Sequence, residues 1–133
     1  MSTSEIRQRL PILLSDLGAR SLLDAPCDDF NWMQKVRLGL DEYIGVDIIP
    51  QLIAHNRERF ANAGRKFVCI DIAGEALPQV DVIFCRDCLV YLPYVDIFRV
   101  LRNFKCSKST YLLATTFVNR TKTPTSRRVP GVR

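Results

Sequence analysis

The sequence has 133 residues, a single histidine and no apolar run that approaches the roughly 20 residues a membrane helix needs. A Ser-His-Asp triad is disfavoured, because only His55 is available and no G-x-S-x-G nucleophile elbow occurs. The polar segment 1–9 lacks the apolar region of a secretory signal behind it. These absences disfavour a membrane protein and a serine hydrolase. We expect a single-domain protein of the cytoplasm, whose hydrophobic content of 47% fills one core.

The net charge of +5 comes entirely from the C-terminal segment, where no acid balances the basic residues. The body before position 120 is neutral, and the excess lies in Arg120, Lys122, Arg127, Arg128 and Arg133. A basic tail with proline, serine and threonine is typically a solvated, disordered end, which we expect over 118–133. We rank nucleic-acid binding through this tail well below that interpretation.

Five cysteines are present, an odd number that does not favour a disulfide framework. Cys69, Cys85 and Cys106 lie in or beside apolar runs, which predicts reduced core thiols. The C-x-x-C spacing of Cys85 and Cys88 is no zinc site on its own, because zinc needs two more ligands and His55 lies on a separate predicted helix. A redox pair normally opens a helix after the first strands, whereas this spacing follows the fourth. We expect no metal.

Short β-branched runs alternate with helical patterns, which predicts an α/β protein with a mostly parallel, doubly wound sheet. Strands are expected at 21–25, 43–47, 66–70, 81–85 and 110–117. Helices are expected at 5–17, 30–38, 50–62 and 93–104, with Pro11 bending or dividing the first and Gly18 ending it. Right-handed crossovers give the strand order 3-2-1-4-5 within one domain over 1–117.

Three of these strands end in an acid, namely Asp24, Asp47 and Asp71. All carboxyl ends of parallel strands lie on one edge of the sheet, where ligands bind. Asp47 lies 23 residues after Asp24, close to the spacing of a ribose-binding acid. Each acid alone is as typical of a helix cap or a solvated loop. Taken together, the three predict a nucleoside site at this edge.

Four segments resemble a known family when taken in order: LLDAPCDDF at 22–30, YIGVDI at 43–48, FVCIDI at 67–72 and VDVIFCRD at 80–87. They resemble the motifs of class I, Rossmann-like methyltransferases that depend on S-adenosylmethionine. In that family the first motif wraps the methionine part of the cofactor, the second holds the ribose and packs on adenine, and the third meets the adenine edge. The fourth lines the cofactor and faces the substrate.

The resemblance implies S-adenosylmethionine as cofactor, S-adenosylhomocysteine as product and methyl transfer as the activity. It implies cofactor contacts from Asp24, Ala25, Pro26, Cys27, Asp28, Phe30, Asp47, Ile48, Asp71, Ile72, Cys85 and Arg86. Asp87 is the candidate for a general base or substrate orienter, with Arg86 as an electrostatic contact. Capping of the following helix is an equally weighted role for Asp87.

The chain departs from the family at three places. Asp28 stands where motif I usually has glycine, so we expect a weakened cofactor affinity, although aspartate tolerates left-handed backbone. Tyr91 replaces a common histidine, so no acid-base role carries over to it. The family's last two strands cannot be read after 117, which predicts a cut-short fold whose fifth strand is an exposed edge suited to homodimer pairing.

Alternatives stay open at this point. A small-molecule acceptor is favoured by default, because the Asn/Asp-Pro-Pro-Tyr/Phe signature of amino-group nucleic-acid methyltransferases is missing after the fourth strand. A nicotinamide-dependent oxidoreductase would need the loop G-x-G-x-x-G, and the segment 24–30 has no glycine. The non-enzyme alternative is an inactive fragment that acts as a binding or dimerisation module.

Overall fold

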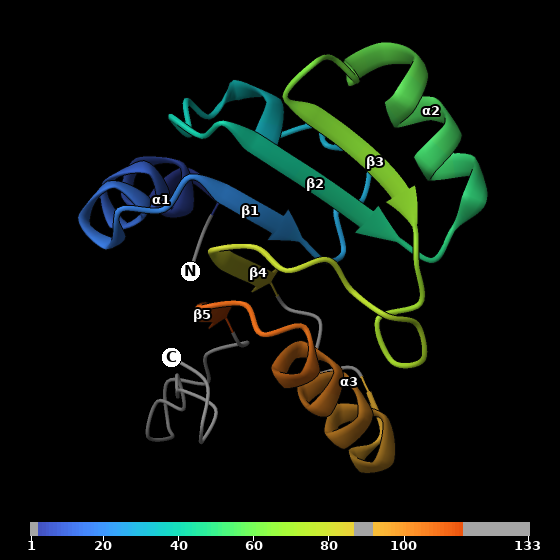
Figure 1. Cartoon of the computed structure of the whole chain (residues 1–133). Coiled ribbons are helices and arrows are strands. Elements are labelled where there is room, and N and C mark those ends of the chain that lie inside the picture. The colour runs from blue at the N-terminus through green and yellow to red at the C-terminus, as the bar shows by residue number, and fades with distance from the viewer. Residues whose placement is uncertain (1–2, 87–91, 116–133) are drawn as a thin grey trace.

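The computed structural model describes residues 3–86 and 92–115, which form a five-stranded parallel sheet (Figure 1). The strand order is β3-β2-β1-β4-β5, so the predicted order and the doubly wound, Rossmann-like fold are confirmed. The strands are β1 (Ser21–Asp24), β2 (Glu42–Asp47), β3 (Arg65–Cys69), β4 (Val82–Arg86) and β5 (Tyr111–Thr115). The helices are α1 (Thr3–Leu17), the short 3-10 helix η1 (Met33–Lys35), α2 (Pro50–Phe60) and α3 (Tyr94–Cys106).

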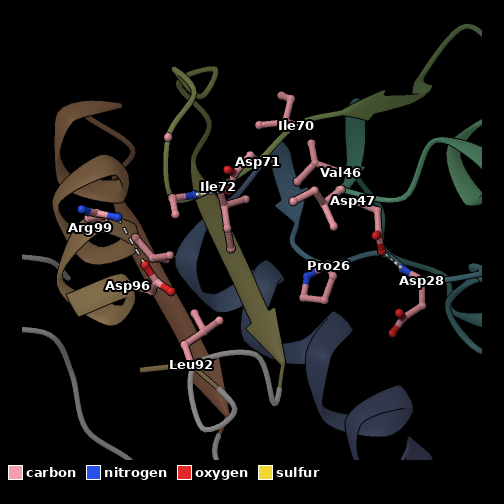
Figure 2. A pocket seen from close by; sticks show the side chains of 14 residues that line it. Pro26, Asp28, Val46, Asp47, Ile70, Asp71, Ile72, Leu92, Asp96 and Arg99 are labelled. Atoms are coloured by element: carbon pink, nitrogen blue, oxygen red, sulfur yellow. Dashed lines mark hydrogen bonds and ion pairs between the residues drawn. The ribbon is translucent and has the colours of Figure 1, made fainter. Parts of the chain in front are cut away.

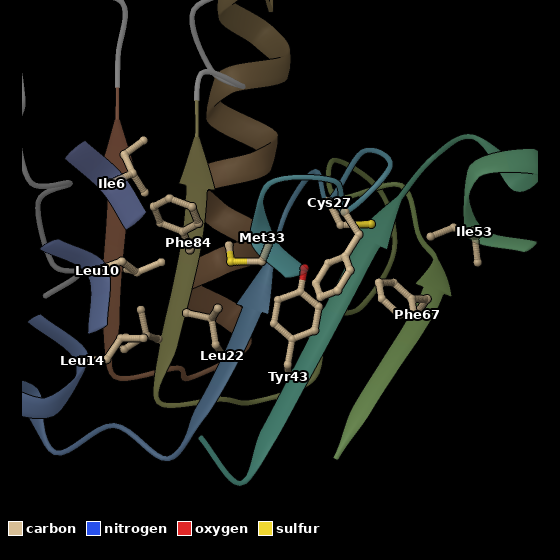
Figure 3. Close-up of a cluster of buried hydrophobic side chains, with 12 residues drawn as sticks. Ile6, Leu10, Leu14, Leu22, Cys27, Met33, Tyr43, Ile53, Phe67 and Phe84 are labelled. Atoms are coloured by element: carbon tan, nitrogen blue, oxygen red, sulfur yellow. The ribbon is translucent and has the colours of Figure 1, made fainter. Parts of the chain in front are cut away.

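Helices cover both faces of the sheet, which explains why its inner strands read as nearly continuous apolar runs. On one face, α1, η1 and α2 pack on a cluster that includes Leu22, Tyr43 and Phe84 (Figure 3). On the other face, α3 contributes Val100 and Phe104 to a cluster with Leu23, Ile83 and Leu112. Neighbouring residues of one strand thus serve opposite cores, as the alternation of a strand requires.

Helix α1 runs through Pro11 as a single element, so the proline does not divide it. Leu10 and Leu14 are both buried against the sheet, and this packing outweighs the backbone hydrogen bond that the proline lacks. Gly18 ends the helix with φ of +67°, and the amide of Ala19 donates to Leu14 O at 2.9 Å. The predicted glycine stop is confirmed.

The predicted helix at 30–38 is wrong, since only the 3-10 turn of η1 forms there. After this turn the backbone of Val36 is extended, with φ of −97° and ψ of 131°. Val36, Leu38 and Leu40 all pack on the same core, which is the two-residue period of an extended chain and not the period of a helix. The segment therefore gives up helical hydrogen bonds to bury every second side chain.

The cysteines also differ from expectation. Cys85 is buried as predicted, but Cys69 and Cys106 are exposed, while Cys27 is buried. Cys69 ends β3, which pairs with β2 alone among the described strands, so an apolar run there does not ensure burial. Cys88 lies outside the described residues.

Within the described part of the chain, β5 pairs only with β4 and so forms the second edge of the sheet. Its pairing with a second copy stays a prediction, and the segment 118–133 lies outside the described residues. No helix described in the structure combines the length and the apolar character that crossing a bilayer requires.

Candidate functional site

A pocket of about 570 Å³ opens at the carboxyl edge of the sheet, between the ends of β1 and β2, the loop after β3, and α3 (Figure 2). Its volume lies in the range of small-molecule sites. Among the described residues it is lined by Pro26, Asp28, Val46, Asp47, Ile48, Ile70, Asp71, Ile72, Ala73, Gly74, Leu92, Asp96, Arg99 and Val100. The predicted ligand edge therefore carries a cavity.

The structure brings together only part of the predicted cofactor set. The predicted residues at this pocket are Pro26, Asp28, Asp47, Ile48, Asp71 and Ile72. The predicted residues buried in the two cores are Asp24, Ala25, Cys27, Phe30 and Cys85. Arg86 lies with its guanidinium over the ring of Trp32, 5.2 Å from the centroid. Asp87, the candidate base, lies outside the described residues, and all cofactor roles stay predictions.

Asp47 lines the pocket at the end of β2 and holds the loop after β1. Only 6% of it is exposed, and each carboxylate oxygen already accepts one backbone hydrogen bond. Oδ2 accepts from the amide of Asp28 at 3.1 Å (Figure 2), and Oδ1 accepts from the amide of Ile49 at 3.1 Å. Each oxygen has a further lone pair, so the carboxylate can still accept from a hydroxyl pair of a ligand.

Asp24 faces the core instead of the cavity. The Tyr43 hydroxyl donates to its Oδ2 at 2.5 Å, and the carboxyl is 4% exposed. Burial raises the pKa of Asp24 to about 7, although the tyrosine hydrogen bond works in the opposite direction. Of the three strand-end acids, Asp47 and Asp71 therefore line the pocket, while Asp24 is buried and does not line it.

The loop after β1 is tied to β2 through its backbone. The amide of Cys27 donates to Val46 O at 2.9 Å, and the next amide donates to Asp47. Asp28 adopts φ of +51°, so the expected left-handed turn forms without glycine. Partial desolvation, and then the charge of Asp47, raise the pKa of Asp28. A carboxylate thus stands at the pocket wall, at the position where motif I of the resembled family usually has glycine.

Phe30 closes this loop as an anchor in the core. Its backbone also has a positive φ of +62°, uncommon for an aromatic residue. The ring lies 5.0 Å from the ring of Phe60 and 5.2 Å from those of Tyr43 and Phe67, with Arg65 over its face. The loop therefore leaves the pocket at Phe30, whose ring packs in an aromatic cluster and does not line the cavity.

Asn56 on α2 holds the same loop from behind, and the sequence analysis missed it. The side chain is fully buried, and its Nδ2 donates to Asp28 O at 2.7 Å and to Cys27 Sγ at 3.7 Å. Its Oδ1 is buried and accepts no hydrogen bond from the described residues. An asparagine in the apolar stripe between Ile53 and Phe60 is the signal that would have found it.

The loop after β3 forms the opposite wall. Asp71 organises its own turn, because its Oδ1 accepts from the amide of Ala73 at 3.0 Å and its carbonyl accepts from Gly74 and Glu75. Asn103 on α3 ties the turn down by donating to Ile72 O at 2.9 Å and to Glu75 O. This wall is therefore built mainly from contacts between near neighbours in the chain.

Helix α3 adds a charged pair that was also missed. Asp96 and Arg99 both line the pocket, and their side chains pair at 3.5 Å, one turn apart (Figure 2). Both side chains keep substantial exposure, so the pair contributes little to stability. Its value is positional, because it places one acid and one base at the rim.

Known proteins resemble this chain in three-dimensional structure but not in sequence. No protein-family model and no curated protein matches the chain. In shape, the chain matches a sugar N-methyltransferase from Streptoalloteichus with a TM-score of 0.72 at 14% identity, covering 92% of this chain and 52% of that one. The chain has the fold of the S-adenosylmethionine-dependent methyltransferases.

Two further methyltransferase structures agree. An amino pentose methyltransferase from Micromonospora echinaspora, solved with S-adenosylmethionine bound, matches with a TM-score of 0.69 at 15% identity, over 92% of this chain and 52% of that one. An N-methyltransferase from Bradyrhizobium japonicum, solved with S-adenosylhomocysteine, matches with 0.68 at 18% identity, over 84% and 60%. The chain thus spans between half and two thirds of the length of these methyltransferases.

Proposed function

We propose that this chain binds S-adenosylmethionine in the pocket and takes part in methyl transfer to a small-molecule acceptor. The observation that carries the proposal is the placement of Asp47, a buried strand-end acid with free acceptor capacity, inside a cavity of about 570 Å³. The two neighbours solved with S-adenosylmethionine or its product support this choice of ligand.

The residues of the pocket fit an adenosine. Beside Asp47, which suits the ribose hydroxyls, Ile48 is 61% exposed and offers an apolar surface to an adenine face. Ile72 lines the cavity from the opposite loop. An exposed isoleucine next to a buried acid is what an amphipathic nucleoside needs, and burial of Ile48 under a base would remove apolar surface from water.

S-adenosylmethionine supplies an activated methyl group on a sulfonium. The chain's own part is to fix the orientation of the donor between the two loops and to keep water from the reacting centre. Asp47 would bind the ribose of the cofactor, and the backbone of 25–28 would shape the site for its methionine part. A proton that leaves the acceptor needs a base, for which Asp87 stays the candidate.

A second candidate function is a binding or dimerisation module without turnover. Asp28 favours this alternative, because its carboxylate at the pocket wall would repel the carboxylate of the cofactor's methionine part. Among the described strands, β5 lies at the edge of the sheet and offers a surface for pairing with a second copy. Under this alternative the nucleoside site is weak or unused. The small-molecule acceptor itself rests on analogy with the sugar and amino pentose neighbours.

Titration calorimetry with S-adenosylmethionine and S-adenosylhomocysteine tests the proposal. We expect saturable binding of both, weaker than a glycine-containing loop would give. Absence of heat and of any thermal stabilisation at millimolar ligand would reject the cofactor assignment, and the binding or dimerisation module would then be the remaining candidate function. Sedimentation at several protein concentrations tests the module separately, and a monomer at all of them contradicts pairing through β5.

A further inference from the structure

Asn56 combines three properties that seldom occur together in a helix. It lies in the apolar stripe of α2, it is completely buried, and its carbonyl oxygen accepts no hydrogen bond among the described residues. An unsatisfied buried acceptor destabilises a fold, and a leucine of similar size at this position would avoid that penalty. The contacts of the amide nitrogen must therefore account for an asparagine here.

The amide nitrogen of Asn56 gives the reason for an asparagine at this position. Nδ2 donates to the carbonyl oxygen of Asp28 at 2.7 Å, across 28 positions of sequence. The backbone amide of Asp28 in turn donates to Asp47 Oδ2 at 3.1 Å. The two peptide groups that flank Asp28 are thus held from two sides, one by the end of β2 and one by α2. A non-glycine residue at φ of +51° keeps that conformation only when its surroundings fix it.

We propose that Asn56 is a positioning residue of the cofactor site, which holds the glycine-free loop 26–28 in its binding conformation and thereby sets the affinity for the cofactor. This inference rests on the proposed function, since the affinity it sets is for S-adenosylmethionine or S-adenosylhomocysteine. Asn56 does not line the pocket among the described residues, so its effect passes through Asp28. The side chain of Asn56 stabilises the positive φ of this turn, which glycine would adopt without strain because it has no Cβ.

Asn56→Asp gives a readout that a purely structural role would not produce. The new carboxyl matches asparagine in shape, and it donates to Asp28 O only when it is protonated. Burial raises the pKa of such a group, so the donor is present at low pH and is lost as the pH rises through that pKa. We expect S-adenosylhomocysteine to bind the variant about 10-fold more weakly than wild type at a pH above this pKa and within about threefold at a pH below it.

Affinities are compared as the ratio of variant to wild type at each pH, because Asp24, Asp28, Asp47 and the buried thiol of Cys27 surround the same loop and affect both proteins. Asn56→Leu lacks a donor at every pH and should stay about 10-fold weaker at both. Ile53→Val, on the same face of α2, is the matched control, since it loosens the core without touching a loop carbonyl. It should leave the affinity within about twofold at both pH values.

Hydrogen exchange of the free protein separates this inference from the proposed function. In Asn56→Leu we expect faster exchange in peptides that cover 26–30, and unchanged exchange over 70–76. Wild type that binds no S-adenosylhomocysteine overturns both the function and the inference. Wild type that binds, together with a pH-independent ratio for Asn56→Asp or equal exchange in the loop of Asn56→Leu, overturns the inference alone.

Discussion

The two loops that wall the pocket are held in opposite ways. The loop after β1 depends on partners that lie far away in the sequence, because Asp28 is held by Asp47 and Asn56, which lie 19 and 28 positions along the chain. The loop after β3 is held chiefly by Asp71, whose hydrogen bonds reach two to four positions ahead. One wall is therefore set by tertiary structure and the other by local turn chemistry.

This contrast predicts where mutations act strongly. A turn that makes most of its own hydrogen bonds tolerates the loss of one distant contact, whereas a loop held at Asp28 by distant partners transmits more of such a loss to its conformation. Changes around the first loop should therefore have large effects on stability and affinity. Changes around the second loop should have small ones, even where the residues line the same cavity.

The largest effect is expected for Phe30→Ala. The substitution removes a ring that is 2% exposed and contacts three aromatic neighbours, and the cavity it leaves should destabilise the protein by about 3–5 kcal/mol. Urea unfolding measures the change. Phe98→Ala on α3 is the control, because that ring is 69% exposed and should cost less than about 0.5 kcal/mol. Similar losses for both variants would contradict the anchor assigned to Phe30.

The next effect is a pH dependence that Asp24 imposes. Its folded pKa of about 7 lies above the ordinary value of 3.8, so the folded protein binds the proton more tightly than the unfolded chain does. The stability that this proton contributes is complete below pH 4 and is lost as the pH rises through 7. The loss is on the order of 4 kcal/mol for a shift of this size.

Asp24→Asn should remove most of this slope, since an amide accepts from Tyr43 without a proton to lose. Unfolding free energies at several pH values between 4 and 8 measure it. Tyr43→Phe is the informative partner variant, because loss of the hydroxyl should raise the pKa of Asp24 further and move the slope to higher pH. Parallel stability curves for wild type and Asp24→Asn would contradict the raised pKa of Asp24.

A smaller but more specific effect is expected for Asp47→Ala. The variant loses the acceptor for two backbone amides and the candidate ribose contact, which should weaken S-adenosylhomocysteine binding about 100-fold. Asp71→Ala, from the local wall, should weaken binding less than 10-fold, because the carbonyl of residue 71 keeps the hydrogen bonds from Gly74 and Glu75. Calorimetry at fixed pH compares the two. An unchanged affinity in Asp47→Ala would remove the ribose assignment, and equal losses would remove the contrast between the walls.

The same contrast explains what could be predicted from the sequence. The strands and their order follow from β-branched runs and their spacing, and the Asp71 turn needs only neighbouring residues. By contrast, the direction of Asp24 depends on Tyr43 in the adjacent strand, which strand alternation in one segment cannot reveal. The helix expected at 30–38 failed because Val36, Leu38 and Leu40 bury with an extended period.

Gly45 shows a further contact of this hidden kind. A Cβ there would lie 2.9 Å from the ring of Phe67 and 3.0 Å from the Cβ of Cys27, so the first loop and two strands meet over its missing side chain. From the sequence, this glycine reads only as part of a strand. The role of Asn56 could not be predicted from the sequence for the same reason, since its partner is a backbone carbonyl whose position no local pattern predicts. The tertiary wall is thus also the wall that sequence reasoning describes least well.

The smallest effect is expected for Asn103→Ala, which makes the sharpest test of the comparison. Asn103 resembles Asn56 in kind, because each is a helix asparagine that donates its amide to carbonyls of a pocket loop. If contact type alone decided the outcome, the two losses would be equal. Because the Asp71 turn retains its local hydrogen bonds, we expect Asn103→Ala to weaken S-adenosylhomocysteine binding less than about threefold, at a stability loss of about 1 kcal/mol. A 10-fold loss, measured beside Asn56→Leu in the same buffer, would mean that local turn chemistry does not protect the second wall.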